Sequence, residues 1–208
     1  MKKLAIVGAG GHSKVVAEIA QLNGWTSLDF FDDRWPTLTQ FSDYTVVGNI
    51  QYFYENHNDY DGVIVAIGNN EIRAKLYLAL SNLDVEFISL IHPRAIISSR
   101  TKIGVGTVIM ANAVINPDVV IGNNCIINSS AVIEHDCIIN DHVHICPNTA
   151  LAGEVKVNKK AWIGIGSTVI QQINIGENVF VGAGSTVIND IPNELKVVGS
   201  PAREIKNN

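Results

Sequence analysis

The residues around position 135 include side chains suited to proton transfer. His135 is flanked directly by Glu134 and Asp136. An imidazole beside a carboxylate is the standard arrangement of a general base, because the carboxylate fixes the ring tautomer and stabilises the imidazolium as it forms. A solvated surface histidine is the competing interpretation of this spacing alone. His135 is therefore a candidate base whose role depends on where the fold places it.

A second candidate site is the glycine-rich loop near the N-terminus. Gly8-Ala9-Gly10-Gly11-His12-Ser13 follows an apolar run and precedes a helical pattern, which is where glycines cradle a phosphate in front of a helix N-terminus. Ser13 stands where the dinucleotide-binding pattern has its third glycine. Asp32 ends the next apolar run, where an acidic residue can bind a ribose hydroxyl. A tight turn before a helix is the competing interpretation.

The cysteines do not indicate a metal site. Cys125, Cys137 and Cys146 form neither a CxxC motif nor a zinc-ligand spacing. We interpret them as free, inert thiols and expect no bound metal. Because an odd number of unpatterned thiols suits a reducing compartment, we expect a cytoplasmic protein.

The elements that position the loop belong to a first domain, residues 1–92. Strands are predicted at 3–8, 28–33, 62–68 and 85–91, and helices at 13–22 and 71–81. Continuous apolar strands that alternate with helices are typical of a parallel sheet covered on both faces. We predict a small Rossmann-like α/β domain.

The elements that position His135 follow a different period, in residues 93–208. Every sixth residue from Ile97 to Val187 is Ile, Leu or Val, without exception. This period predicts a solenoid of short parallel strands, with three sides in each coil of 18 residues. We expect these anchors to fill the interior and the small residues four places later to fit the corners. Glycines that directly follow anchors are expected to permit unusual backbone angles; they are Gly104, Gly122, Gly164, Gly176 and Gly182.

The repeat places the candidate residues relative to one another. His135 comes two places after anchor Ile133 and should point outward. Gly153 follows one coil later, about 4.8 Å along the axis, where its N–H could face a developing oxyanion. His144 lies half a coil from His135, on another side, so the two would converge only across neighbouring subunits. His142 and His57 are expected to be surface residues.

Composition excludes several other classes of protein. Hydrophobic residues make up 47% of the 208 residues and charged residues 17%, which is typical of a globular chain. The net charge of −5 gives no electrostatic reason for a nucleic acid or an anionic membrane as partner. No apolar run has the length of a membrane span.

Taken together, these motifs make the chain resemble the left-handed β-helix (hexapeptide-repeat) acyltransferases. More narrowly, it resembles bacterial sugar O- and N-acetyltransferases with a small Rossmann-like sugar-nucleotide domain in front. The motifs that carry the resemblance are GAGGH (8–12), FDD (31–33), IGNNEIR (67–73), IHPRA (91–95), IEHDC (133–137), HICP (144–147), LAG (151–153) and GSPA (199–202). Left-handedness follows from the resemblance only, since general crossover rules predict the opposite hand.

The resemblance implies an activity and a set of site residues. IGNNEIR and IEHDC point most closely to enzymes of the bacillosamine type, which use acetyl-CoA to acetylate the 4-amino group of a UDP-linked 4-amino-4,6-dideoxy-N-acetyl sugar. His135 would be the proton acceptor, and Asp136 would raise its basicity. Relatives often carry Glu at 136, and Asp is one methylene shorter, so Glu134 is the alternative orienting residue. The acetyl-CoA site would comprise His144, Gly153, Ile165 and Ala183. The sugar-nucleotide site would comprise Gly10, Gly11, His12, Asp32, Asp33 and Gly68.

The resemblance also implies a homotrimer with active sites at subunit interfaces, and direct transfer without a covalent acyl-enzyme. The nearest alternatives are O-acetylation of sialic acid and N-acetylation of a GDP- or dTDP-linked amino sugar. An NAD-dependent dehydrogenase is disfavoured, because about 90 residues supply half of a dinucleotide fold and Ser13 breaks its pattern. A non-catalytic scaffold would predict no acetyl-CoA binding.

Overall fold

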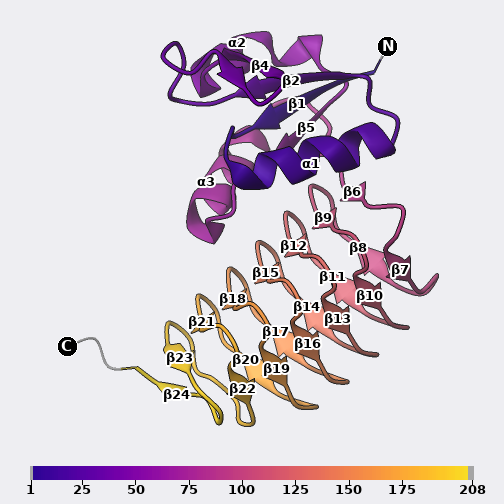
Figure 1. The fold of residues 1–208 in the computed structure, drawn as a ribbon, viewed down its shortest axis with the longest axis vertical. Coiled ribbons are helices and arrows are strands. Elements are labelled where there is room, and N and C mark those ends of the chain that lie inside the picture. Colours follow the sequence, from indigo (N-terminus) through magenta and orange to yellow (C-terminus); the bar gives the residue numbers. More distant parts are fainter. Residues whose placement is uncertain (1, 206–208) are drawn as a thin grey trace. The chain divides into compact units, whose positions relative to one another are not determined.

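The computed structural model describes residues 2–205, which divide into two compact units, one up to Ile91 and one from His92 (Figure 1). The first unit is an α/β domain around a mostly parallel sheet. The second is a stack of short parallel strands, a left-handed β-helix. The predicted fold class is thereby confirmed.

The first unit has a sheet with the strand order β3-β4-β2-β1-β5. Strands β1 and β5 are almost fully buried, as their apolar sequences require, whereas β2 is fully buried only at Phe30 and Phe31. Only β3 pairs antiparallel to its neighbour in this sheet. The strands are β1 (Lys3–Val7), β2 (Ser27–Phe31), β3 (Gln40–Phe41), β4 (Tyr44–Gly48) and β5 (Gly62–Val65). The helices are α1 (Gly11–Leu22), α2 (Ile50–Asn56), the short 3-10 helix η1 (His57–Asp59) and α3 (Asn70–Leu80).

Two parts of this unit differ from the sequence prediction. The predicted strand at 85–91 forms only the two-residue β6 (Leu90–Ile91) and an isolated bridge between Phe87 and Val63. The strand predicted at 62–68 ends at Val65, because the chain turns there into the loop that Asn69 closes as the N-cap of α3. The elements β3, β4 and α2 were not predicted, since their patterns are short and partly exposed.

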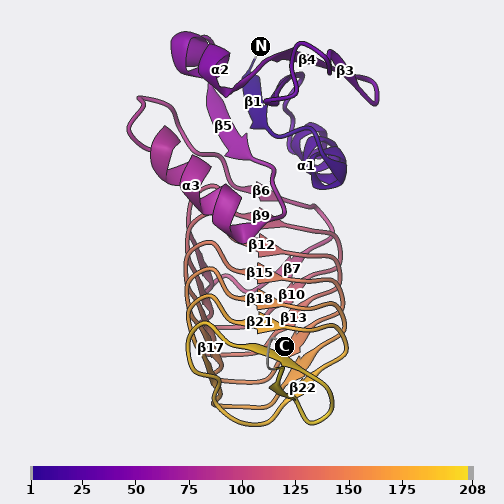
Figure 2. The ribbon, with the colours of Figure 1, turned by 90° about the vertical axis from the view of Figure 1, so that its left-hand side faces the viewer.

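The second unit has three faces, each a ladder of strands one coil apart as far as residue 187, after which the last two strands form an antiparallel pair at the end of the third face (Figures 1 and 2). The first face contains β7 (Ile96–Ile97), β10 (Val114–Ile115), β13 (Val132–Ile133), β16 (Ala150–Leu151), β19 (Thr168–Val169) and β22 (Thr186–Val187). The second contains β8 (Lys102–Ile103), β11 (Val120–Ile121), β14 (Ile138–Ile139), β17 (Lys156–Val157) and β20 (Asn174–Ile175). The third contains β9 (Val108–Ile109), β12 (Ile126–Ile127), β15 (His144–Ile145), β18 (Trp162–Ile163), β21 (Phe180–Val181), β23 (Lys196–Val198) and β24 (Arg203–Glu204).

The interior of the coils follows the predicted period. Anchor residues from Ile109 to Val187 are buried, and each strand pairs in register with the strand 18 residues away, as Ile133 does with Ile115 and Leu151. The small residues four places after the anchors are buried as well, including Ala131 and Cys137. Aliphatic packing along one axis therefore holds the corners, and the side chains on them, in a fixed register.

The role predicted for the glycines after the anchors was wrong. Their φ angles are not positive; the positive φ occurs at the third residue after an anchor, which is usually not glycine, as at Asp118 and Lys160. The glycines are needed for space. A Cβ on Gly104 would lie 2.6 Å from the carbonyl carbon of Gly122, and one on Gly164 would lie 2.5 Å from the carbonyl oxygen of Val181. Close contact between successive coils explains these glycines.

The prediction that His142 is a surface residue was also wrong. Its side chain is buried, and its Nδ1 lies 2.9 Å from the side-chain nitrogen of Asn124, one coil earlier. At a corner, each residue stacks on its counterpart in the next coil, so a residue at a corner can still be buried. The three cysteines are free, as predicted, and they are buried. No helix in the described part of the chain combines the length and the apolar character that a membrane crossing requires.

Candidate active site

His135 lies on the corner that joins the first and second faces of the β-helix, just after β13. Its side chain points outward and is 57% exposed. The ring Nδ1 lies 2.8 Å from Oδ2 of Asp136. Glu134 contacts another residue, since its Oε2 accepts a hydrogen bond from Asn116 at 2.7 Å. Of the two carboxylates considered from the sequence, the structure therefore places Asp136 on the ring.

This contact makes the imidazole a stronger base. With Nδ1 on the carboxylate, the neutral ring carries its proton on Nδ1 and keeps the lone pair of Nε2 for a substrate proton. The hydrogen bond that the ring donates to Asp136 raises the pKa of His135 above its usual value, and the nearby charges of Asp136, Glu134 and Glu154 add to the rise. Partial desolvation of the ring opposes it.

Gly153 lies directly against the ring of His135. A Cβ at this position would lie 2.6 Å from Cε1 and 2.7 Å from Nε2 of His135, so only glycine leaves the ring in this place. The Nε2 edge of the ring therefore faces the coil of Gly153. Within residues 2–205, no acceptor is found for the Gly153 N–H. A base and a backbone donor thus lie together, as their spacing of one coil predicted.

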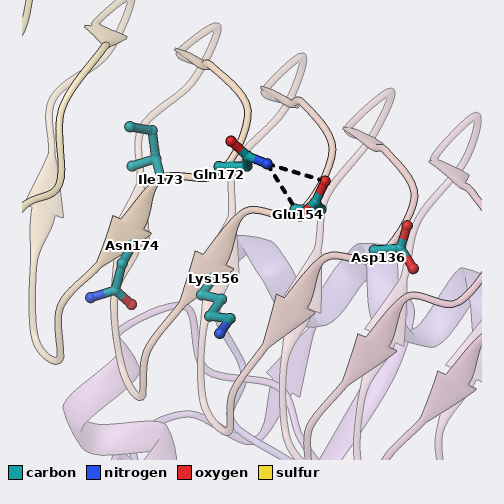
Figure 3. Close-up of a pocket in the computed structure, with 6 residues that line it drawn as sticks. All are labelled: Asp136, Glu154, Lys156, Gln172, Ile173 and Asn174. Carbon is teal, nitrogen blue, oxygen red and sulfur yellow. Dashed lines mark hydrogen bonds between the residues drawn. The ribbon is translucent and has the colours of Figure 1, made fainter.

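An open groove of about 570 Å³ is lined by Asp136, the partner of His135 (Figure 3). Asp136, Glu154 and Gln172 lie on three successive coils along one side of it, and Gln172 donates to Glu154 at 3.4 Å. The remaining lining residues are Lys156, Ile173 and Asn174. The groove therefore offers room for a substrate next to Asp136, in surroundings that carry charges of both signs.

The residues predicted to bind acetyl-CoA are distributed over two corners and one face. Gly153 lies beside His135, but Ile165 and Ala183 are exposed on the corner that joins the third face to the first. His144 lies in β15 on the third face, where Nε2 is 3.0 Å from the side-chain nitrogen of Asn128 and the ring meets Trp162 edge-on. Within one chain, these four residues do not come together.

The glycines of the first unit have two different roles. Gly8 has a φ of 109°, and a Cβ on it would lie 2.9 Å from Cγ1 of Ile67, so it lets the loops after β1 and β5 approach each other. Open space, by contrast, surrounds the Cβ positions of Gly10, Gly11 and Gly68. The three glycines predicted to bind the sugar nucleotide therefore leave room beside the backbone.

Ser13 and Asp32 organise the first of these loops. Ser13 is buried; its hydroxyl donates to the carbonyl of Ala66 at 3.0 Å and accepts from the Gly10 N–H at 3.2 Å. A glycine could not make these bonds, which explains the departure from the dinucleotide pattern. Asp32 accepts from the Ala9 N–H at 2.9 Å and pairs with Arg34 at 2.7 Å.

Asp32 and Asp33, directly after β2, border a hollow of about 160 Å³, which is also lined by Gly8, Ile50, Ile67 and Ile72 among others. Hydrogen bonding with Arg34, more than any other contact, lowers the pKa of Asp32 to about 2. Asp33 accepts from the Ile50 N–H at 3.3 Å. The sequence analysis did not identify Arg34. Its position two residues after Asp32 could have indicated the ion pair.

His12 lies at the start of α1 and is neutral at physiological pH. Burial, and secondarily the positive charge of Arg73, lower its pKa to about 4. Its Nε2 is buried and has no hydrogen-bond partner within residues 2–205. The predicted residue therefore keeps one ring nitrogen for a ligand.

Asp136→Asn is expected to lower the pKa of His135, because it removes both the carboxylate bond and a negative charge. The acid limb of kcat/KM should move to lower pH, and the plateau rate should fall as the base weakens. An NMR titration of the ring together with a pH–rate profile measures both effects. Asp118→Asn, at the same corner one coil earlier, is the matched control and should leave the pKa of His135 in place. An unchanged pKa in Asp136→Asn would contradict the assignment of the orienting contact.

Two family models match the sequence. The PglD N-terminal domain matches residues 3–80, and the bacterial transferase hexapeptide (six repeats) matches residues 100–134 and 118–153. A UDP-N-acetylbacillosamine N-acetyltransferase of Bacillus subtilis (strain 168) is 43% identical over 114 residues, which are 53% of this chain and 52% of that protein. The matched segment therefore spans about half the length of that relative.

Solved structures match nearly the whole chain. The acetyltransferase domain of PglB from Neisseria gonorrhoeae FA1090 is 36% identical, with a TM-score of 0.93 over 99% of this chain and 100% of that chain. The same domain has been solved in complex with acetyl coenzyme A. PerB from Caulobacter crescentus, in complex with CoA and GDP-perosamine, is 34% identical, with a TM-score of 0.93 over 99% of this chain and 98% of that chain.

Proposed function

This chain belongs to the hexapeptide-repeat acetyltransferases with a PglD N-terminal domain, and from that premise we propose that it transfers an acetyl group from acetyl-CoA to the amino group of a nucleotide-linked amino sugar. The observation that carries the proposal is the cluster of His135, Asp136 and Gly153. It combines an oriented base with a backbone donor beside an open groove. The preferred acceptor is the 4-amino group of a UDP-linked 4-amino-4,6-dideoxy-N-acetyl sugar, in line with the Bacillus relative.

The proposed reaction is a direct transfer within a ternary complex. The sugar amine attacks the thioester carbonyl, forming the C–N bond, and Nε2 of His135 takes a proton from the amine. The Gly153 N–H donates to the tetrahedral oxyanion. The C–S bond then breaks, and the imidazolium returns its proton to the thiolate, which leaves as the CoA thiol. Asp136 stabilises the imidazolium between these steps.

The proposal includes a homotrimer in which neighbouring chains complete each acetyl-CoA site. It is supported by the positions of Gly153 and Ile165 on different corners of the same β-helix, since one acetyl-CoA could contact both only where two chains lie side by side. The Neisseria domain, solved with acetyl coenzyme A, supports the choice of donor. Light scattering should give three times the mass of the chain, and the mass of one chain would contradict this arrangement.

A GDP-linked amino sugar is a second candidate acceptor, because the Caulobacter enzyme was solved with GDP-perosamine. The experiment is a series of acceptors: the UDP-linked 4-amino sugar, its GDP- and dTDP-linked counterparts, and a sialic acid, with products analysed by mass spectrometry. The proposal expects an N-acetyl product with the UDP sugar. An acetylated product from the sialic acid alone would retain the mechanism and move the acceptor to a hydroxyl. Acetylation of none of them would overturn the proposal.

A further inference from the structure

The motif Ile67–Arg73 ends in a buried arginine that the candidate site has not yet explained. Arg73 belongs to the first turns of α3, yet it is 1% exposed because its side chain turns back under the loop before the helix. Its Nη1 donates to the carbonyls of Ile67 and Gly68, both at 3.0 Å, and its Nη2 donates to Oδ1 of Asn70 at 2.8 Å. One guanidinium thus binds two carbonyls of a short loop and the side chain of the first residue of α3.

Other contacts hold the same loop from its two ends. The hydroxyl of Ser13 binds the carbonyl of Ala66, and Oδ1 of Asn69 accepts the N–H of Ile72 as the cap of α3. Three successive carbonyls, from Ala66 to Gly68, are therefore occupied by protein donors. Within residues 2–205, the N–H groups of Gly68 and Asn69 have no acceptor, and the Cβ position of Gly68 faces open space. The loop keeps its donors for a ligand.

The charge of Arg73 also reaches the neighbouring loop. It is the charged group that lowers the pKa of His12, at the start of α1. The buried cation therefore lies near the N-termini of both α1 and α3, where unpaired N–H groups and the helix dipoles favour an anion. At these helix starts, His12 contributes a buried Nε2 without a partner in the described chain.

We propose that Arg73 is a positioning residue of the sugar-nucleotide site, which fixes the β5–α3 loop so that its N–H groups bind the diphosphate of a nucleoside diphosphate sugar. The proposal rests on the proposed function, because that function supplies the nucleotide-linked acceptor. Arg73 acts through Gly68 and Asn69 and does not touch the ligand itself. Its planar fork is what allows one side chain to hold several acceptors, which a lysine cannot reproduce.

Arg73→Lys is the test, because it retains the positive charge and removes the planar guanidinium that donates to several acceptors. Loss of charge-assisted hydrogen bonds should raise the KM for the nucleotide sugar, and the Kd for UDP measured by calorimetry, roughly ten- to hundredfold. The KM for acetyl-CoA and kcat should stay within about twofold, because the catalytic corner lies in the other unit. Lys75→Met, an exposed cation on the same helix, is the matched control and should change neither constant.

A purely structural arginine would predict a different pattern. Arg73→Lys with a lower Tm and an unchanged Kd for UDP would overturn the proposal, as would a parallel rise in both KM values. If Arg73→Lys does not fold, Asn70→Ala is the second test, because it removes one of the hydrogen-bond acceptors of Arg73 and leaves the buried charge in place. Asn70→Ala should raise the Kd for UDP several-fold, and an unchanged Kd would again overturn the proposal.

The wild-type protein separates this inference from the function on which it rests. If wild type binds neither UDP nor any nucleotide sugar, the proposed function fails and this inference fails with it. If wild type binds UDP and acetylates the amino sugar while Arg73→Lys binds UDP equally well, only the role of Arg73 is wrong.

Discussion

His135→Ala is expected to lower kcat/KM by about 10² to 10⁴ without unfolding the protein. The loss arises because Nε2 takes the proton of the attacking amine and later returns it to the leaving thiolate. The fold should be unaffected, because the ring points outward from its corner, and none of the interior packing of the coil depends on it. Steady-state thiol release gives the rate, and thermal unfolding followed by circular dichroism gives the stability.

The matched control is His57→Ala, a histidine of the other unit whose Nδ1 contacts the carbonyl of Tyr54. It should retain wild-type kcat/KM. Binding of acetyl-CoA to His135→Ala should remain close to that of wild type, which separates the loss of the base from the loss of the site. A His135→Ala protein that is fully active, or that is unfolded, would contradict the role assigned to this residue.

Gly153→Ala is expected to lower kcat by about 10², although it adds a single methyl group. That methyl group would stand 2.6 Å from Cε1 of His135, so the ring must move. The backbone of Gly153 does not have a positive φ, so alanine can adopt its conformation and the coil should remain folded. Rates and Tm values of the variant measure the two effects separately.

A double-mutant cycle tests the cause of this loss. If the methyl group acts by displacing the base, Gly153→Ala should have little further effect on kcat in a His135→Ala background, so the two changes would be strongly non-additive. Additive losses would show instead that Gly153 contributes independently of the ring, and wild-type activity in Gly153→Ala would exclude the close contact altogether.

Much of the second unit could be predicted because its geometry is one-dimensional. A strict period of six fixes which residues face inward, and a coil of 18 residues fixes which residues stack, so the contact of Gly153 with His135 followed from their numbers. The backbone conformation of the corners could not be predicted in the same way. Glycines such as Gly164 are required because the next coil lies too close for a side chain. That distance depends on the shape of the coil in three dimensions.

Side-chain partners were harder to predict than positions. Asp136 and Glu134 flank the same histidine, and the sequence leaves open which of them binds it. Asn116, one coil away, donates a hydrogen bond to Glu134, and Asp136 contacts the ring. Asp32 was predicted to contact a nucleotide, but its carboxylate also binds Arg34 and the Ala9 N–H. Such contacts depend on side-chain rotamers and loop geometry, which hydrophobic patterns do not encode.

The measurement that most directly tests the account is thiol release from acetyl-CoA by the wild-type protein, with two UDP sugars that differ only at position 4. One carries the amine and the other a hydroxyl at that carbon. We expect rapid release with the amine, at most slow release with the hydroxyl, and no release without an acceptor. Equal release with both sugars, or release that does not depend on an acceptor, would contradict N-acetyl transfer to an amino sugar.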